Sequence, residues 1–154
     1  GQRPAVDVGI SVSRVGGDAQ TKAMKQVAGN LRLDLASYQE LAGFTQFGSD
    51  LDEATQKQLT HGARMTELLK QGRFAAMDVE DQVVAIFAGD QGFLDGMPVS
   101  DTLRFRDDLV QYMHTVRKDL KEKIATEKQL TDAIKEELLE AITTFKQSFI
   151  IAKK

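Results

Sequence analysis

Apolar residues recur at intervals of three and four along most of this sequence, and this spacing is the feature that most limits the fold. The first such stripe comprises Met24, Val27, Ala28, Leu31, Leu35, Tyr38, Leu41 and Ala42. Residues spaced in this way share one face of an α-helix, and that face must be buried against another element. Comparable stripes continue as far as Phe149. We therefore expect an all-α bundle of five or six helices.

Capping residues and glycines give the expected helix boundaries. The expected starts are Asp18, the segment 49–53 in which Asp50 and Glu53 resemble a capping box, Asp78, Ser100 and Thr131. Gly72 is expected as the C′ residue of the second helix, and Gly29 predicts a bend or close packing in the first. The fourth helix is expected to run unbroken to Ile124, with the charge run 117–123 as a solvated face.

One segment departs from the helical spacing. Residues 5–13 are rich in β-branched side chains and form the only strand-like run. The run ends at Arg14, and Gly16 and Gly17 then let the backbone turn sharply. This order predicts Arg14 at a strand-to-helix corner, where its guanidinium can point outward at an anion. From spacing alone, an ordinary surface or salt-bridged arginine is the commoner explanation.

Composition and motifs exclude several classes of function. A net charge of −3 and a pI near 5.4 argue against non-specific nucleic-acid binding. The absence of cysteine excludes disulfides, zinc-thiolate sites and thiol catalysis, and no apolar run is long enough to span a membrane. His61 and His114 lack metal-ligand spacing, so no metal site is expected. The chain opens without methionine, which is compatible with a fragment or a processed product.

Several sequence words, in order and at matching spacing, resemble the alpha subunit of F-type rotary ATP synthases. They are Arg-Pro-Ala-Val-Asp-Val-Gly-Ile-Ser-Val-Ser-Arg-Val-Gly-Gly at residues 3–17, Gln20–Lys25, Leu31–Ala36, Phe47–Asp52 and Glu67–Gln71. The resemblance is specific up to about Asp95 and looser from there to the end. It implies that residues 1–17 are a remnant of the nucleotide-binding domain, with one short strand and the arginine loop, and that residues 18–154 are the C-terminal helical domain.

The resemblance also implies roles for individual residues. Arg14 would be an arginine finger that reaches, in trans, the terminal phosphate bound on a neighbouring beta subunit, and Ser11 would be required for activity. Gln71 would contact the adenine of a non-catalytic nucleotide. The family has a second glutamine two places on, where this chain has Arg73, an arginine that could stack on the base instead. Residues 49–52 stand where the beta relative carries its acidic lever loop, although here they read mainly as a helix cap.

A function for the whole assembly follows from the same resemblance. The proton-transporting complex would synthesise or hydrolyse ATP, with beta subunits and the central and peripheral stalks as partners, no nucleic acid, and membrane contact only through the complex. The full subunit would bind ATP or ADP with Mg²⁺. This fragment would hold no cofactor and be inactive alone, because it contains no Gly-x-x-x-x-Gly-Lys-Ser/Thr loop. Its expected place is the soluble head, with the cytoplasmic face of a bacterial inner membrane favoured over an organellar matrix or stroma.

Two alternatives stay open at this point. The chain could be an autonomous helical protein-interaction module without nucleotide chemistry, because exposed apolar helix faces also bind partner helices. It could also be a beta or vacuolar-type relative, but the word Ser-Val-Ser-Arg-Val-Gly-Gly at residues 11–17 argues against that assignment.

Overall fold

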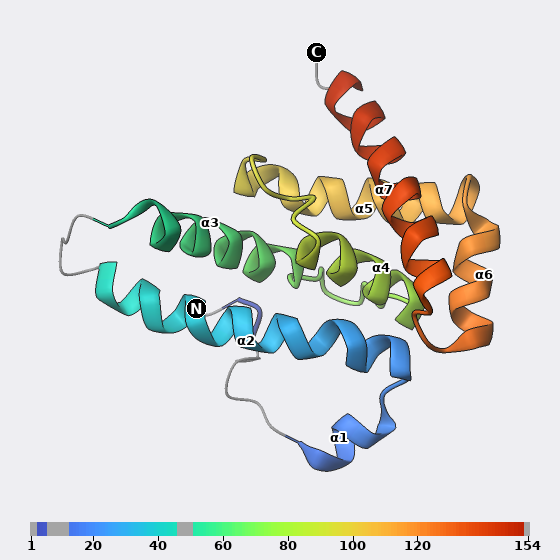
Figure 1. The fold of residues 1–154 in the computed structure, drawn as a ribbon, viewed down its shortest axis with the longest axis horizontal. Helices are drawn as coiled ribbons and strands as arrows, with labels where there is room; N and C mark the ends of the chain where they lie inside the picture. The colour runs from blue at the N-terminus through green and yellow to red at the C-terminus, as the bar shows by residue number, and fades with distance from the viewer. Residues whose placement is uncertain (1–2, 6–12, 46–50, 153–154) are drawn as a thin grey trace.

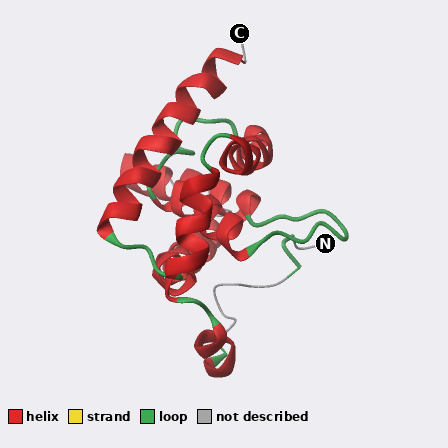
Figure 2. Cartoon of the chain, turned by 90° about the vertical axis from the view of Figure 1, so that its right-hand side faces the viewer, coloured by secondary structure: helices red, strands yellow, loops and turns green. Residues whose placement is uncertain are grey.

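The computed structural model describes residues 3–5, 13–45 and 51–152. In these ranges the chain forms seven α-helices, one short 3-10 helix and no strand (Figures 1 and 2). The elements are α1 (Arg14–Ala19), α2 (Lys22–Thr45), α3 (Glu53–Leu68), α4 (Val79–Asp90), η1 (Val99–Asp101), α5 (Thr102–Thr115), α6 (Lys118–Glu127) and α7 (Asp132–Ala152). The all-α prediction is confirmed, with seven helices rather than five or six. Most of the strand predicted at 5–13 lies outside the described residues.

Helix α4 lies at the centre of the bundle. Every residue from Val83 to Gly89 is buried, so this helix is covered on all sides rather than on one face. It packs against α2, α3, α5 and α6 (Figure 1). The remaining helices are therefore arranged around it, each with its apolar stripe turned inward.

Helix α7 is held to α5 by aromatic side chains. Phe105 is fully buried, and its ring centroid lies 5.2 Å from that of Phe145 and 5.3 Å from that of Phe149, both in edge-on geometry. Such pairs contribute about 0.5–1.5 kcal/mol each beyond the area that they bury. This cluster fixes the last helix across the bundle.

The first two predicted helix starts are wrong. The sequence predicts Asp18 as an N-cap, but the chain is already helical at Arg14, and Asp18 lies inside α1. Ser13 caps α1 by accepting a 3.0 Å hydrogen bond from the Gly16 amide. Thr21 does the same for α2, accepting from Met24 N at 3.2 Å. Two hydroxyl residues thus take the role assigned to one carboxylate, because serine and threonine cap helices about as well as aspartate.

The bounds of α3 also differ from the prediction. Its N-cap is Asp52, whose carboxylate accepts hydrogen bonds from Thr55 N at 2.9 Å and Thr55 Oγ1 at 2.8 Å. These bonds, the backbone one first, lower the pKa of Asp52 from its ordinary value. Asp50, the predicted first member of a capping box, lies outside the described residues. The helix ends at Leu68, so Gly72 is not its C′ residue.

The predicted fourth helix is two helices. Helix α5 ends at Thr115, and α6 begins at Lys118. At the break, Val116 is 61% exposed although the apolar stripe assigned it to the core. Ser100, the predicted cap, lies inside η1. By contrast, Asp78 is the N-cap residue of α4 as predicted.

None of the helices in the described ranges combines the length and the apolar character that crossing a bilayer requires.

Candidate functional site

Arg14 is the first residue of α1 and is exposed. The Ser13 hydroxyl fixes the backbone beside it, and Ser13 O also accepts from Gly17 N at 2.9 Å. No residue of α1 is buried, and the helix stands off the bundle in both ribbon views (Figures 1 and 2). The predicted strand-to-helix corner is therefore an isolated helical turn, and Ser11 lies outside the described residues.

A groove separates α1 from α2. Arg14 lines it together with Lys25 and Arg32 of α2, and Asp18 is the one carboxylate among its lining residues. Within the described ranges, no carboxylate forms an ion pair with any of the three cations. The groove is therefore positively charged, although the whole chain carries a net charge of −3.

Gln71 and Arg73 lie together at a second concavity, beyond the end of α3. Both are exposed, and the concavity that they line also includes Lys70 and Arg106. The Arg73 guanidinium lies 4.9 Å from the centroid of the Phe74 ring, an exposed aromatic. The structure thus brings Gln71 and Arg73 to one concave surface, while Arg14 lines a separate groove.

Arg106 fixes the backbone that precedes Gln71. This buried side chain donates from Nη1 to the carbonyl oxygen of Leu68 at 3.1 Å and to that of Lys70. Asp107 Oδ1 accepts from its Nε at 2.8 Å and lies 2.7 Å from its Nη2. A cation at the carboxyl end of a helix satisfies carbonyl groups that have no partner within the helix. Nothing in the sequence pattern indicated this role.

Four charged or titratable side chains from three helices meet at the start of α4. Lys121 Nζ lies 2.9 Å from Asp78 Oδ2, 3.1 Å from Asp81 Oδ2 and 2.6 Å from His114 Nε2. His114 Nε2 is 2.9 Å from Asp81 Oδ2, and Asp81 is buried. Sequence reasoning missed this group, because its members are separated by dozens of residues and none has a recognisable spacing.

The group is an ion-pair network rather than an open metal site. Asp78, Asp81 and His114 could each offer one ligand atom to a metal ion. The Lys121 ammonium already lies within hydrogen-bond distance of all three, so a cation would have to displace it. The hydrogen bond from Lys121, and then its charge, lower the pKa of Asp78. Burial opposes the charged form of Lys121, but the two carboxylates outweigh it and raise the lysine pKa.

Replacing Lys121 with methionine should lower the free energy of unfolding by about 1 kcal/mol, because buried Asp81 loses one partner but keeps His114. The pair with Asp78 stabilises the fold above the carboxyl's ordinary pKa of 3.8 and is lost as the pH falls through its lowered value. It is also lost when the pH rises through the raised pKa of Lys121, above 10.5. Urea denaturation of both proteins should therefore give curves that differ at pH 7 and converge toward pH 3. A constant difference down to pH 3 would contradict this assignment.

Two comparisons with known proteins identify the family. The family model described as ATP synthase alpha/beta chain, C terminal domain, matches residues 20–145. The ATP synthase subunit alpha of Syntrophomonas wolfei subsp. wolfei (strain DSM 2245B / Goettingen) is 52% identical over 151 residues, which cover 98% of this chain and 30% of the relative. The chain thus spans less than a third of the length of that relative. It belongs to the family of C-terminal domains of ATP synthase alpha and beta chains, and within that family to the alpha subunits.

Proposed function

We propose that this domain presents Arg14 across a subunit boundary to the terminal phosphate of a nucleotide bound by a neighbouring beta subunit. The observation that carries the proposal is an exposed guanidinium with no carboxylate partner among the described residues, on a helix that buries none of its own side chains. An arginine that stabilised its own domain would be paired or packed, as Arg106 is.

The chemistry of phosphoryl transfer suits an arginine in this place. Negative charge spreads over the equatorial oxygens of the transferring group, and a planar, permanently charged guanidinium can meet two of them. Ser11 would support the way in which Arg14 is presented, so a bulky residue there should act through the position of the guanidinium. Multisite ATP turnover of the assembled complex carrying Arg14→Ala tests the proposal.

In the whole assembly the domain would pack against beta subunits and contact the central and peripheral stalks. The complex would couple proton flow to ATP synthesis from ADP and phosphate, or the reverse, and the domain would lie in its soluble head. The bacterial relative supports the cytoplasmic face of a bacterial inner membrane as its place. Gln71 would contact the adenine of a non-catalytic nucleotide, since its amide can offer both a donor and an acceptor to the base edge. Arg73 would stack on the same base.

The isolated chain should show no measurable ATP binding by titration calorimetry at millimolar nucleotide, with or without Mg²⁺. Gln71 and Arg73 can contact only the base, and this sequence supplies no phosphate-binding loop. The full-length subunit serves as the positive control in the same buffer. Micromolar affinity in the isolated chain would overturn the view that the triphosphate is held by other parts of the complex.

A further inference from the structure

The outer face of α2 is a second interaction surface of this domain, distinct from the arginine itself. The inner face of the helix buries Ala23, Val27, Leu31 and Leu35 in the core. On the other face Leu33 is 69% exposed, and Ala28 and Ala36 lie beside it along the groove. Helix α2 therefore carries apolar groups on two sides, and only one of them is covered by this chain.

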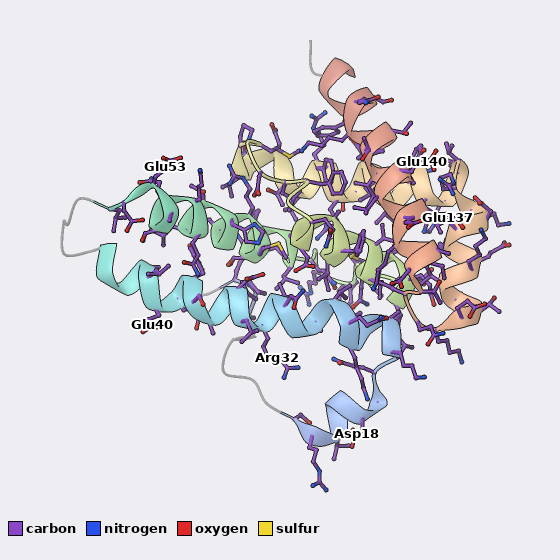
Figure 3. All side chains as sticks on the ribbon, in the orientation of Figure 1. Asp18, Arg32, Glu40, Glu53, Glu137 and Glu140 are labelled. Carbon is purple, nitrogen blue, oxygen red and sulfur yellow. The ribbon has the colours of Figure 1, made fainter. Side chains whose placement is uncertain are left out.

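Charge surrounds this apolar strip. Lys25 and Arg32 border it on α2, and Arg14 stands at the α1 edge of the same groove. Figure 3 shows Arg32 projecting from α2 on the side where α1 and Asp18 lie. The groove has a volume of about 870 Å³, which is enough for several side chains of a partner. Helix α1 does not fill it, because no residue of α1 is buried.

We propose that this groove receives an acidic segment of the neighbouring beta subunit, with its carboxylates on Lys25 and Arg32 and an apolar side chain against Leu33. The inference rests on the proposed function, since the chain that receives Arg14 would be the one seated along the groove. Complementary charge is the reason to choose an acidic occupant: three cations and one carboxylate line a groove on a chain that is otherwise net negative.

Charge reversal in the full-length subunit tests the acidic character of the occupant. Lys25→Glu with Arg32→Glu should weaken association with beta subunits by about tenfold or more at low salt and flatten its salt dependence. The matched control is Lys57→Glu with Lys118→Glu, which makes the same charge change at two exposed residues paired only within their own helices. Association of the Lys25/Arg32 variant as tight as that of the control would overturn the proposal.

Cysteine labelling tests coverage without altering charge. Nothing lies within 4 Å of a side chain built at Gly29 on the groove, so Gly29→Cys should fold normally. In a background without other reactive cysteines, a maleimide should label it about tenfold more slowly in the assembled complex than in the free subunit. Ala125→Cys on α6, also at an exposed position, should be labelled equally in both. Equal labelling at Gly29 would overturn the docking proposal.

The two proposals fail in different ways. If Gly29→Cys stays fully reactive in the complex while Arg14→Ala abolishes turnover, the groove is not the interface and the arginine proposal stands. If Gly29→Cys is protected and Arg14→Ala turns over normally, the interface stands and the arginine has no part in catalysis.

Discussion

Multisite ATP turnover of the assembled complex should fall by about 10³- to 10⁵-fold when Arg14 is replaced with alanine, which is the range for an arginine finger supplied in trans. This loss corresponds to roughly 4–7 kcal/mol of transition-state stabilisation. Assembly and nucleotide occupancy should change little, because Arg14 is exposed and makes no ion pair with the described part of its own domain. Steady-state hydrolysis, with a native gel and a nucleotide count on the same preparation, provides the measurement.

Two variants sharpen this experiment. Arg14→Lys should recover little of the turnover, because an ammonium is a point charge and lacks the two-pronged geometry of the guanidinium. Arg104→Ala removes another exposed arginine, one that stacks 4.2 Å from the centroid of the Phe149 ring, and should leave turnover at the wild-type level. A complex that fails to assemble with Arg14→Ala would instead make the residue structural.

The helical class of the fold was predictable because apolar spacing is a local property. Stripes on successive segments require helices that pack on one another, whatever the exact ends. Turns set by glycine were also local: Gly92 and Gly96 have φ of 74° and 76°, left-handed values that favour glycine, at the predicted break after α4. Asp78 begins α4 as its sequence indicated.

Contacts between helices were not predictable, because no local rule pairs residues far apart in the chain. The charge run 117–123 illustrates this limit. It was interpreted as a solvated face with pairs along one helix, and Lys118 with Glu122 is such a pair. Its other lysines bind other helices: Lys123 pairs with Glu137 of α7 at 2.8 Å, and Lys121 joins the carboxylates of α4. These pairs also accompany the break between α5 and α6.

The candidate site shows the same division. Arg14, Gln71 and Arg73 were singled out because a family resemblance supplied roles that spacing did not. The residues that position them were missed, since Ser13 acts through a cap and Arg106 through carbonyl groups 36 and 38 residues away. Such supporting contacts depend on the packed structure rather than on a motif.

Close packing of two helices at a glycine gives the second large expected effect. Gly62 of α3 is buried against α2, and a Cβ built there would lie 2.4 Å from the Cβ of Tyr38. The Tyr38 Cβ is fixed to the α2 backbone, so rotation of the ring cannot relieve the clash, and α2 and α3 must move apart. Overpacking of this kind costs about 1–3 kcal/mol, whereas alanine gains about 1 kcal/mol in helix propensity. We expect Gly62→Ala to lower the free energy of unfolding by about 2 kcal/mol.

The same substitution at Gly29 should have the opposite sign. This glycine was the one predicted to mark a bend or close packing, but nothing lies within 4 Å of a Cβ built there, and α2 continues through it. Gly29→Ala should therefore raise the free energy of unfolding by up to about 1 kcal/mol through propensity alone. Urea denaturation of the two variants beside the parent chain separates the effects, because propensity is common to both and only the neighbouring helix differs. If Gly62→Ala were as stable as Gly29→Ala, the contact between α2 and α3 would be too loose to select glycine.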